Sequence, residues 1–354
     1  MGKSSTVATI DVLTPIWQRV LQHPSVRAED NFFDLGGDPS LAVQLFKEIA
    51  NAFGRELPPL TIYQAPTLAA LTVLLEGATV PPFPTLIRLK EGEAESPIFI
   101  THGLGGSVME VFYVVEGIQS RHPIYGLQSR GLDGKVEPLT RVEDMAEYYL
   151  GVITNLQPRG PYALIGYSFG GLVMMEIAQQ LHERGEKVAL LAMLETYPHR
   201  NHLPLKIRLG LFAARAKRHA SILRKLTMEK RVAYLTRRSE RRLYAYWSDK
   251  DDGRATREPE TGLLFATGVG SVRHAESLAL ARYRPRFYPG KINYVKASVD
   301  LSLFPNDLEG IWGKLAEKFE VDTVPCAHFG IVTTQCQEVA AILSRHLAAA
   351  FSGE

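Results

Sequence analysis

A serine flanked by glycines lies near the middle of the chain. Residues 166–171 read Gly-Tyr-Ser-Phe-Gly-Gly and directly follow a short apolar run at residues 162–165. The run predicts a buried strand, and apolar residues at helical spacing in residues 172–178 predict a helix after the glycines. A serine on a sharp strand-to-helix turn with side-chain-free neighbours projects its hydroxyl toward a substrate. Ser168 is therefore the first candidate nucleophile, although a glycine-rich turn that only packs a helix onto a sheet has the same residues.

Length and composition limit the classes of protein to which the chain can belong. Its 354 residues are many for one compact domain and predict two. Charged residues make up 22% and the formal net charge is +2, which argues against nucleic-acid binding and against disorder. Lys and Arg are concentrated between about residues 200 and 250. A solvated basic face, an anionic partner or substrate, and a membrane surface are all open explanations.

The cysteines and the N-terminus indicate the compartment. Cys326 and Cys336 are too few for a disulfide framework and have no metal-ligand spacing around them, so we expect no metal site. The N-terminus lacks the apolar stretch of a signal peptide, and no run is long enough to span a bilayer. We therefore expect a cytoplasmic protein without a transmembrane segment.

Apolar spacing divides the chain into two units. Residues 8–76 predict a small all-α unit. Residues 77–85 are rich in proline and predict a linker. From residue 86 to 354 predicted strands alternate with helices, which indicates a mostly parallel sheet.

A loop of the small unit carries a second chemical candidate. Residues 31–41 read Asn-Phe-Phe-Asp-Leu-Gly-Gly-Asp-Pro-Ser-Leu at the start of a predicted helix, and residues 64–71 read Gln-Ala-Pro-Thr-Leu-Ala-Ala-Leu. Both segments resemble acyl and peptidyl carrier domains, a four-helix family, over residues 8–76. The resemblance implies a serine at the helix start that carries covalent 4′-phosphopantetheine. A helix N-terminus stabilises the charge of such a phosphodiester.

The carrier motif departs from its usual form at the serine. With no gap allowed, the family's serine falls on Pro39, and Ser40 lies one residue later. Asp38 as the N-cap and Pro39 as the first helical residue would place Ser40 in the first turn. Two hypotheses remain open. Either Ser40 is the attachment residue, shifted by one position, or the unit is a degenerate carrier that only docks.

The larger unit has a resemblance of its own. Residues 101–107 read Thr-His-Gly-Leu-Gly-Gly-Ser after a predicted strand, and residues 125–134 read Tyr-Gly-Leu-Gln-Ser-Arg-Gly-Leu-Asp-Gly. With the serine turn, and in this order, they resemble the thioesterase domains that end nonribosomal peptide and polyketide synthases. The resemblance implies an α/β-hydrolase fold over residues 86–354, with a helical lid at about residues 199–282. It also implies an oxyanion hole formed by the backbone amides of Leu104 and Phe169.

The same resemblance supplies candidates for the base and the acid of a triad. His328 precedes the predicted terminal helix, where this fold has its histidine, and resembles the family's Gly-Asp-His-Phe although Cys326-Ala327 replaces the usual pair. Residues 194–198 read Leu-Glu-Thr-Tyr-Pro, so Glu195 takes the place of the family's aspartate. Asp300, after a later predicted strand, is the alternative acid.

Together the resemblances imply a carrier joined to a serine thioesterase. It would release an acyl or peptidyl chain from phosphopantetheine through an ester on Ser168, by hydrolysis or cyclisation, in secondary-metabolite biosynthesis. The expected partners are upstream synthetase or synthase modules, or a separate acyl carrier, and a phosphopantetheinyl transferase. Two alternatives stay open: an editing thioesterase or esterase with a degenerate docking carrier, and a non-catalytic carrier or docking protein.

Overall fold

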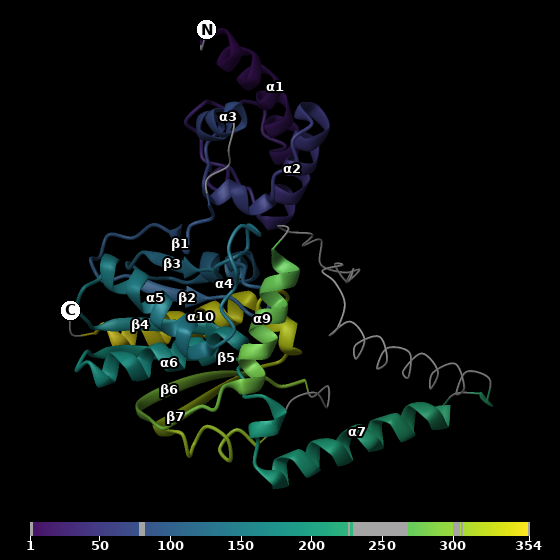
Figure 1. Ribbon diagram of the computed structural model, residues 1–354, viewed down its shortest axis with the longest axis vertical. Coiled ribbons are helices and arrows are strands. Elements are labelled where there is room, and N and C mark those ends of the chain that lie inside the picture. The colour runs from purple at the N-terminus through teal and green to yellow at the C-terminus, as the bar shows by residue number, and fades with distance from the viewer. Residues whose placement is uncertain are drawn as a thin grey trace.

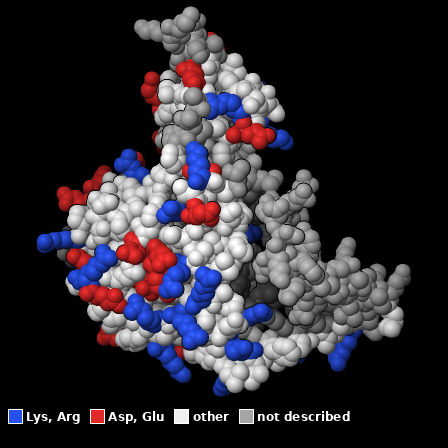
Figure 2. Space-filling model, in the orientation of Figure 1, with Lys and Arg blue, Asp and Glu red and all other residues white. Residues whose placement is uncertain are grey.

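The protein is described by a computed structural model that covers residues 3–77, 82–225, 227–228, 268–299, 305 and 307–352. Figure 1 shows a helical N-terminal unit packed against one end of a larger unit that is built around a sheet. No helix in the described ranges is both long enough and apolar enough to cross a membrane. Acidic and basic side chains are interspersed over the face shown in Figure 2.

The N-terminal unit packs its helices around one apolar core. It contains α1 (Lys3–Leu21), α2 (Pro39–Phe53), the 3₁₀ helix η1 (Pro59–Tyr63) and α3 (Leu68–Glu76). Trp17 and Phe32 meet edge to face at the centre, with ring centroids 5.6 Å apart. Four helices were expected here, and one of them is only a 3₁₀ turn. It spans five residues and begins at the second of two consecutive prolines.

The larger unit is built on seven described strands in the order β1-β3-β2-β4-β5-β6-β7. Their bounds are β1 Leu86–Lys90, β2 Ile98–Thr101, β3 Ile124–Leu127, β4 Tyr162–Tyr167, β5 Val188–Leu194, β6 Tyr288–Ala297 and β7 Ala316–Val324. β1 pairs antiparallel with β3, and the other pairs are parallel. The predicted mostly parallel sheet is therefore confirmed.

Alternate residues of the strands contact helices on the two faces of the sheet. Leu164 of β4 packs in one cluster with α5 (Val142–Leu156) and α6 (Phe169–Glu183). Its chain neighbour Ile165 packs in a second cluster with α4 (Phe112–Gly117) and α10 (Cys336–Ala350). Burial on both faces explains why the residues of β4 are apolar without alternation.

The segment predicted to form a lid is described only in part. It includes η3 (Arg200–His202), α7 (Leu205–Lys225) and α9 (Val269–Arg282). α7 extends away from the sheet (Figure 1), and Leu209 and Phe212 on it are largely exposed. Residues 229–267 of the predicted lid lie outside the described residues.

Candidate active site and attachment site

Ser168 lies on the sharp turn that the glycine pattern predicts. It follows β4 directly and precedes α6, and its φ of 51° and ψ of −115° are uncommon for a residue with a side chain. The two glycines after the turn pack closely against neighbouring residues. A Cβ on Gly170 would collide with the His102 carbonyl, and one on Gly171 would collide with Thr196. Both glycines therefore bring neighbouring loops against the serine turn.

Glu195 and His328 lie together although 133 residues separate them in the sequence. Glu195 follows β5, is 3% exposed, and places Oε2 3.2 Å from Nδ1 of His328. Its other oxygen, Oε1, accepts hydrogen bonds from the Ala297 amide (2.7 Å) and the Tyr197 hydroxyl (3.1 Å). A buried carboxylate held in this way fixes the orientation of an imidazole and stabilises its protonated form. Asp300, the alternative acid, lies outside the described residues.

The imidazole of His328 also contacts the strand that precedes the serine. Its ring stacks on the ring of Tyr167, with centroids 5.5 Å apart and planes at 28°. Tyr167 is the chain neighbour of Ser168. Because Nδ1 faces Glu195, Nε2 is the candidate base nitrogen.

The glycine-rich loop after β2 lies against the serine turn. Gly105 and Gly106 have φ values of +128° and +82°, a conformation that L side chains rarely adopt. The amide of Gly103 donates to Glu110 Oε2 at 2.9 Å, and the amide of Gly105 donates to Glu276 Oε2 at 2.7 Å. Two carboxyl groups therefore hold the peptide groups on either side of Leu104.

His102 at the start of this loop is part of a buried network. Its Nδ1 lies 2.7 Å from the Gly103 carbonyl, which only accepts hydrogen bonds, so Nδ1 carries the proton. Its Nε2 lies 2.9 Å from the Tyr149 hydroxyl and 3.2 Å from Ser129 Oγ. Burial lowers the pKa of His102 to about 4. His102 is therefore a neutral structural residue of the loop.

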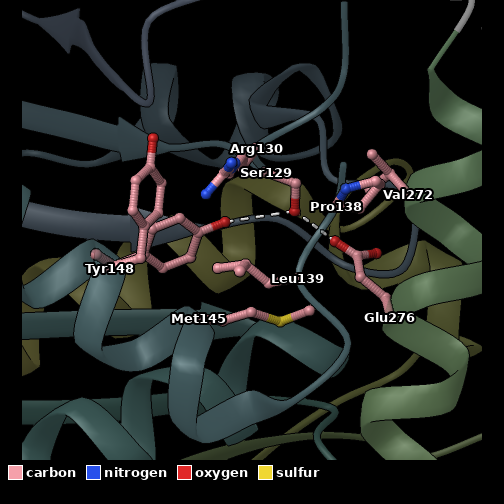
Figure 3. A pocket seen from close by; sticks show the side chains of 9 residues that line it. Ser129, Arg130, Pro138, Leu139, Met145, Tyr148, Val272 and Glu276 are labelled. Atoms are coloured by element: carbon pink, nitrogen blue, oxygen red, sulfur yellow. Dashed lines mark hydrogen bonds between the residues drawn. The ribbon is translucent and has the colours of Figure 1, made fainter. Parts of the chain in front are cut away.

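Glu110 and Glu276 were not candidates in the sequence. Ser129 donates to Glu276 Oε1 at 2.6 Å beside a small pocket that Leu139, Met145 and Val272 also line, as Figure 3 shows. Burial raises the pKa of Glu276 to about 8, and desolvation raises that of Glu110 to about 7. No sequence signal identifies Glu276, because it lies 171 residues from Gly105 along the chain.

The start of α2 has the arrangement that the sequence predicts. Asp38 is the N-cap, Pro39 is the first helical residue and is buried, and Ser40 follows it in the first turn with an exposed side chain. Asp38 Oδ1 accepts from the Leu41 amide (2.8 Å) and from the Ser40 hydroxyl (2.7 Å). An exposed hydroxyl at the N-terminus of a helix fits the attachment of a phosphodiester.

The N-terminal unit contacts the sheet unit close to Ser40. The Tyr113 hydroxyl at the start of α4 donates to Asp38 Oδ2 at 3.1 Å. Phe33 packs between Tyr63 of its own unit and Phe112 of α4, with centroid distances of 4.9 and 5.6 Å. An aromatic cluster and a hydrogen bond to the N-cap of α2 thus join the two units.

Two families match the chain. Residues 11–75 match the family described as the phosphopantetheine attachment site. Residues 96–233 match the thioesterase domain family.

The relatives are synthases much longer than this chain. A dimodular nonribosomal peptide synthase of Bacillus subtilis (strain 168) is 39% identical over 207 residues, which are 58% of this chain and 9% of that protein. The indigoidine synthase of Dickeya dadantii (strain 3937) is 35% identical over 179 residues, 51% of this chain and 12% of that protein. The chain therefore spans only a small part of the length of these relatives.

Solved structures share the fold. A four-domain nonribosomal peptide synthetase bound to AMP and glycine aligns with 97% of this chain and 26% of its own, with a TM-score of 0.56 and 23% identity. The NocB thioesterase domain from the nocardicin cluster aligns with 72% of this chain and 95% of its own, with a TM-score of 0.50 and 17% identity. This chain therefore joins a carrier domain of the phosphopantetheine-attachment family to a thioesterase domain with the α/β-hydrolase fold.

Proposed function

We propose that the chain releases an acyl or peptidyl group from its own carrier domain through an ester on Ser168. The observation that carries this proposal is the contact of Glu195 with His328, whose ring stacks on Tyr167, the residue directly before a serine on a strained strand-to-helix turn. We assign the carrier to residues 8–76, the linker to residues 77–85 and the thioesterase domain to residues 86–354, with a lid at about residues 199–282. Upstream synthetase modules would supply the acyl or peptidyl group.

In this proposal Ser168 Oγ attacks the thioester carbonyl while His328 Nε2 takes its proton. The amides of Leu104 and Phe169 stabilise the charge that develops on the carbonyl oxygen, an effect worth about 10²–10³ in rate for one donor. His328 then gives the proton to the leaving sulfur. Water or a nucleophile within the acyl chain attacks the Ser168 ester, His328 again takes the proton, and Ser168 recovers it as the product leaves.

The phosphopantetheine arm would attach at Ser40. Its thiol is the group that holds the acyl chain as a thioester. Ser40 presents an exposed hydroxyl in the first turn of α2, at the positive end of the helix dipole. A phosphopantetheinyl transferase would catalyse this modification. Pro39 itself is buried and is the first residue of the helix, so it contributes to packing and to helix initiation.

Intact-mass spectrometry tests both halves of the proposal. The protein is incubated with a broad-specificity phosphopantetheinyl transferase and medium-chain acyl-CoA, next to Ser40→Ala and Ser168→Ala. We expect the parent to gain an acylated arm and then to lose the acyl group with time. We expect the acyl group to remain on the arm of Ser168→Ala, and no mass to be added to Ser40→Ala.

A fluorophosphonate probe separates the alternatives. Labelling that depends on Ser168, without modification of Ser40, would favour an editing thioesterase or esterase with a degenerate docking carrier. The presence of a buried proline, Pro39, at the family's serine position is the feature that supports this second candidate. Absence of Ser168-dependent labelling in the folded parent would overturn both enzyme functions.

A further inference from the structure

The glycine-rich loop is attached to the rest of the domain on both sides of one peptide group. Gly103 donates its amide hydrogen to Glu110, and Gly105 donates its amide hydrogen to Glu276. Within the described residues, no protein acceptor is recorded for the Leu104 amide between them. The two carboxyl groups thus fix the neighbouring peptides and leave the amide of Leu104 available.

The two anchors come from different parts of the fold. Glu110 lies in η2 (Val108–Val111), directly after the loop. Glu276 lies in α9, the last helix of the segment predicted to be a lid, and it is fully buried. Its second oxygen accepts from Ser129, which follows β3, and His102 Nδ1 lies 3.7 Å from the same oxygen. α9 is therefore bonded to the loop and to the segment that follows a neighbouring strand.

Two glycines of the loop lie close to the carboxyl group of Glu110. A Cβ on Gly103 would lie 2.8 Å from Glu110 Oε2 and 3.1 Å from the Tyr167 ring. One on Gly105 would lie 3.3 Å from Glu110 Oε1, in a backbone conformation unfavourable for other residues. A side chain at either glycine would therefore crowd the carboxyl group of Glu110.

A negatively charged carboxylate beside an oxyanion hole would repel the negative charge that develops on the carbonyl oxygen. Protonated carboxyl groups avoid this repulsion. Burial raises the pKa of Glu276 to about 8 and desolvation raises that of Glu110 to about 7. A protonated carboxyl still accepts a hydrogen bond through its carbonyl oxygen. The loop is then anchored near neutral pH with less negative charge next to the oxygen that becomes charged in the transition state.

We propose that Glu110 and Glu276 are positioning residues that preorganise the oxyanion hole by fixing the peptides on either side of the Leu104 amide. This inference rests on the proposed function, because it assigns the Leu104 amide to the oxyanion of the Ser168 reaction. A donor that is fixed in advance stabilises the transition state without reorganisation, and a displacement of about 1 Å can cost about 10²-fold in rate. The geometry also links α9 to the reaction centre.

Three variants of Glu276 separate its possible roles. Glu276→Leu removes the acceptor, Glu276→Gln keeps an oxygen for the Gly105 amide, and Glu276→Asp withdraws the carboxyl by one methylene. With octanoyl-N-acetylcysteamine thioester as the substrate, we expect Glu276→Leu to lower kcat about 10- to 100-fold and to change KM less than twofold. We expect Glu276→Gln to stay within about threefold of the parent and Glu276→Asp to lie between them.

A second measurement reports on the oxyanion hole itself. An alkyl boronic acid forms a tetrahedral adduct on a nucleophilic serine, and we expect Glu276→Leu to weaken its binding at least tenfold. Glu110→Leu is expected to do the same from the other side of the loop. If Glu276→Leu does not fold, Glu276→Asp and Glu110→Leu give the same readout.

The matched control is another buried glutamate. Glu176 in α6 accepts from the Tyr283 hydroxyl (2.9 Å) and from Arg286 (3.1 Å) and has no recorded contact with the loop. Glu176→Leu is expected to lower thermal stability while leaving kcat and boronate binding within about twofold. Unchanged kcat and boronate affinity in folded Glu276→Leu and Glu110→Leu would overturn the inference, whereas a parent without Ser168 labelling would overturn the proposed function instead.

Discussion

At the scale of single residues, Glu195 has a strained backbone conformation and a side chain held by several contacts. Its φ is +46°, and its carboxylate accepts from the Ala297 amide and the Tyr197 hydroxyl and contacts His328. A non-glycine residue in this conformation costs about 1–3 kcal/mol and persists where its surroundings hold it in place. The strain is consistent with a side chain that must reach one particular imidazole nitrogen.

Glu195→Gln tests this assignment. An amide that keeps its oxygen on the Ala297 amide presents NH₂ to His328 Nδ1, which forces the imidazole into the tautomer that cannot act as a base through Nε2. We expect kcat for octanoyl-N-acetylcysteamine thioester to fall about 10³- to 10⁴-fold with little change in KM. Glu195→Asp is the control and should retain more activity. A loss smaller than tenfold in Glu195→Gln would favour Asp300 as the acid.

The buried carboxyl groups predict how stability depends on pH. The pKa values of Glu276 and Glu110 are raised to about 8 and about 7, so the unfolded chain ionises these groups from about pH 4.5 while the folded protein does not. Folding stability therefore falls as the pH rises and levels off near pH 8. The lowered pKa of His102, about 4, acts in the opposite sense below about pH 6.5. We expect the Tm of the parent to fall between pH 6.5 and 8, and that of Glu276→Gln to fall less.

Calorimetry or thermal fluorescence across this window measures the difference. Glu147→Gln, which changes an exposed glutamate of α5, is the control and should have the slope of the parent. Equal slopes in the parent and Glu276→Gln would show that Glu276 is ionised in the folded protein.

At the scale of elements, the packing of α6 decides where Ser168 lies. The helix begins at Phe169, and its first turn approaches the loops after β2 and β5 closely at Gly170 and Gly171. Helix propensity alone would favour alanine over glycine inside a helix. Both positions need glycine because neighbouring atoms fill the space that a Cβ would take.

Gly171→Ala measures that constraint. The added Cβ collides with the side chain of Thr196, so we expect a loss of about 1–3 kcal/mol in the free energy of unfolding. Gly151→Ala inside α5 is the matched control, because nothing lies within 4 Å of its added Cβ and the change should stabilise by about 0.5–1 kcal/mol. Chemical denaturation compares the two, and a neutral or stabilising Gly171→Ala would contradict the packing argument.

At the scale of the whole molecule, the carrier and thioesterase domains meet at α4. Phe33 contacts Phe112, and Tyr113 donates to Asp38, the residue that also accepts from Ser40. Met109, Leu132 and Val272 of the larger unit belong to the same buried cluster as the carrier core. This contact brings the start of α2, and with it the proposed attachment residue Ser40, against the domain that holds Ser168.

Tyr113→Phe tests whether this contact serves transfer between the domains. Loss of the hydrogen bond to Asp38 is expected to slow release from a Ser40-linked thioester about three- to tenfold, because a hydrogen bond to a charged group contributes roughly 1.5–3 kcal/mol and less where it is exposed. Hydrolysis of the free N-acetylcysteamine thioester should not change. Phe33→Ala approaches the same contact from the carrier side. Equal effects on both substrates would assign Tyr113 to the active site rather than to docking.

The sequence by itself determined the local chemistry of this protein. Residues 166–171 predict the serine turn because glycine spacing sets backbone conformation locally, and Asp38-Pro39-Ser40 predicts the helix start for the same reason. The alternation of strands and helices also predicts a parallel sheet, because it reflects burial periodicity along the chain. These features depend on residues a few positions apart.

Only the tertiary structure decided which distant groups meet. The pairing of Glu195 with His328 follows from strand order, which places residues far apart in the sequence at the same edge of the sheet. Glu276 has no local signal, because a glutamate in a helix normally faces water. It becomes an anchor here only because α9 packs against the loop. The contact between Tyr113 and Asp38 likewise depends on how the two domains pack. Long-range packing determines these contacts, and no short sequence pattern specifies it.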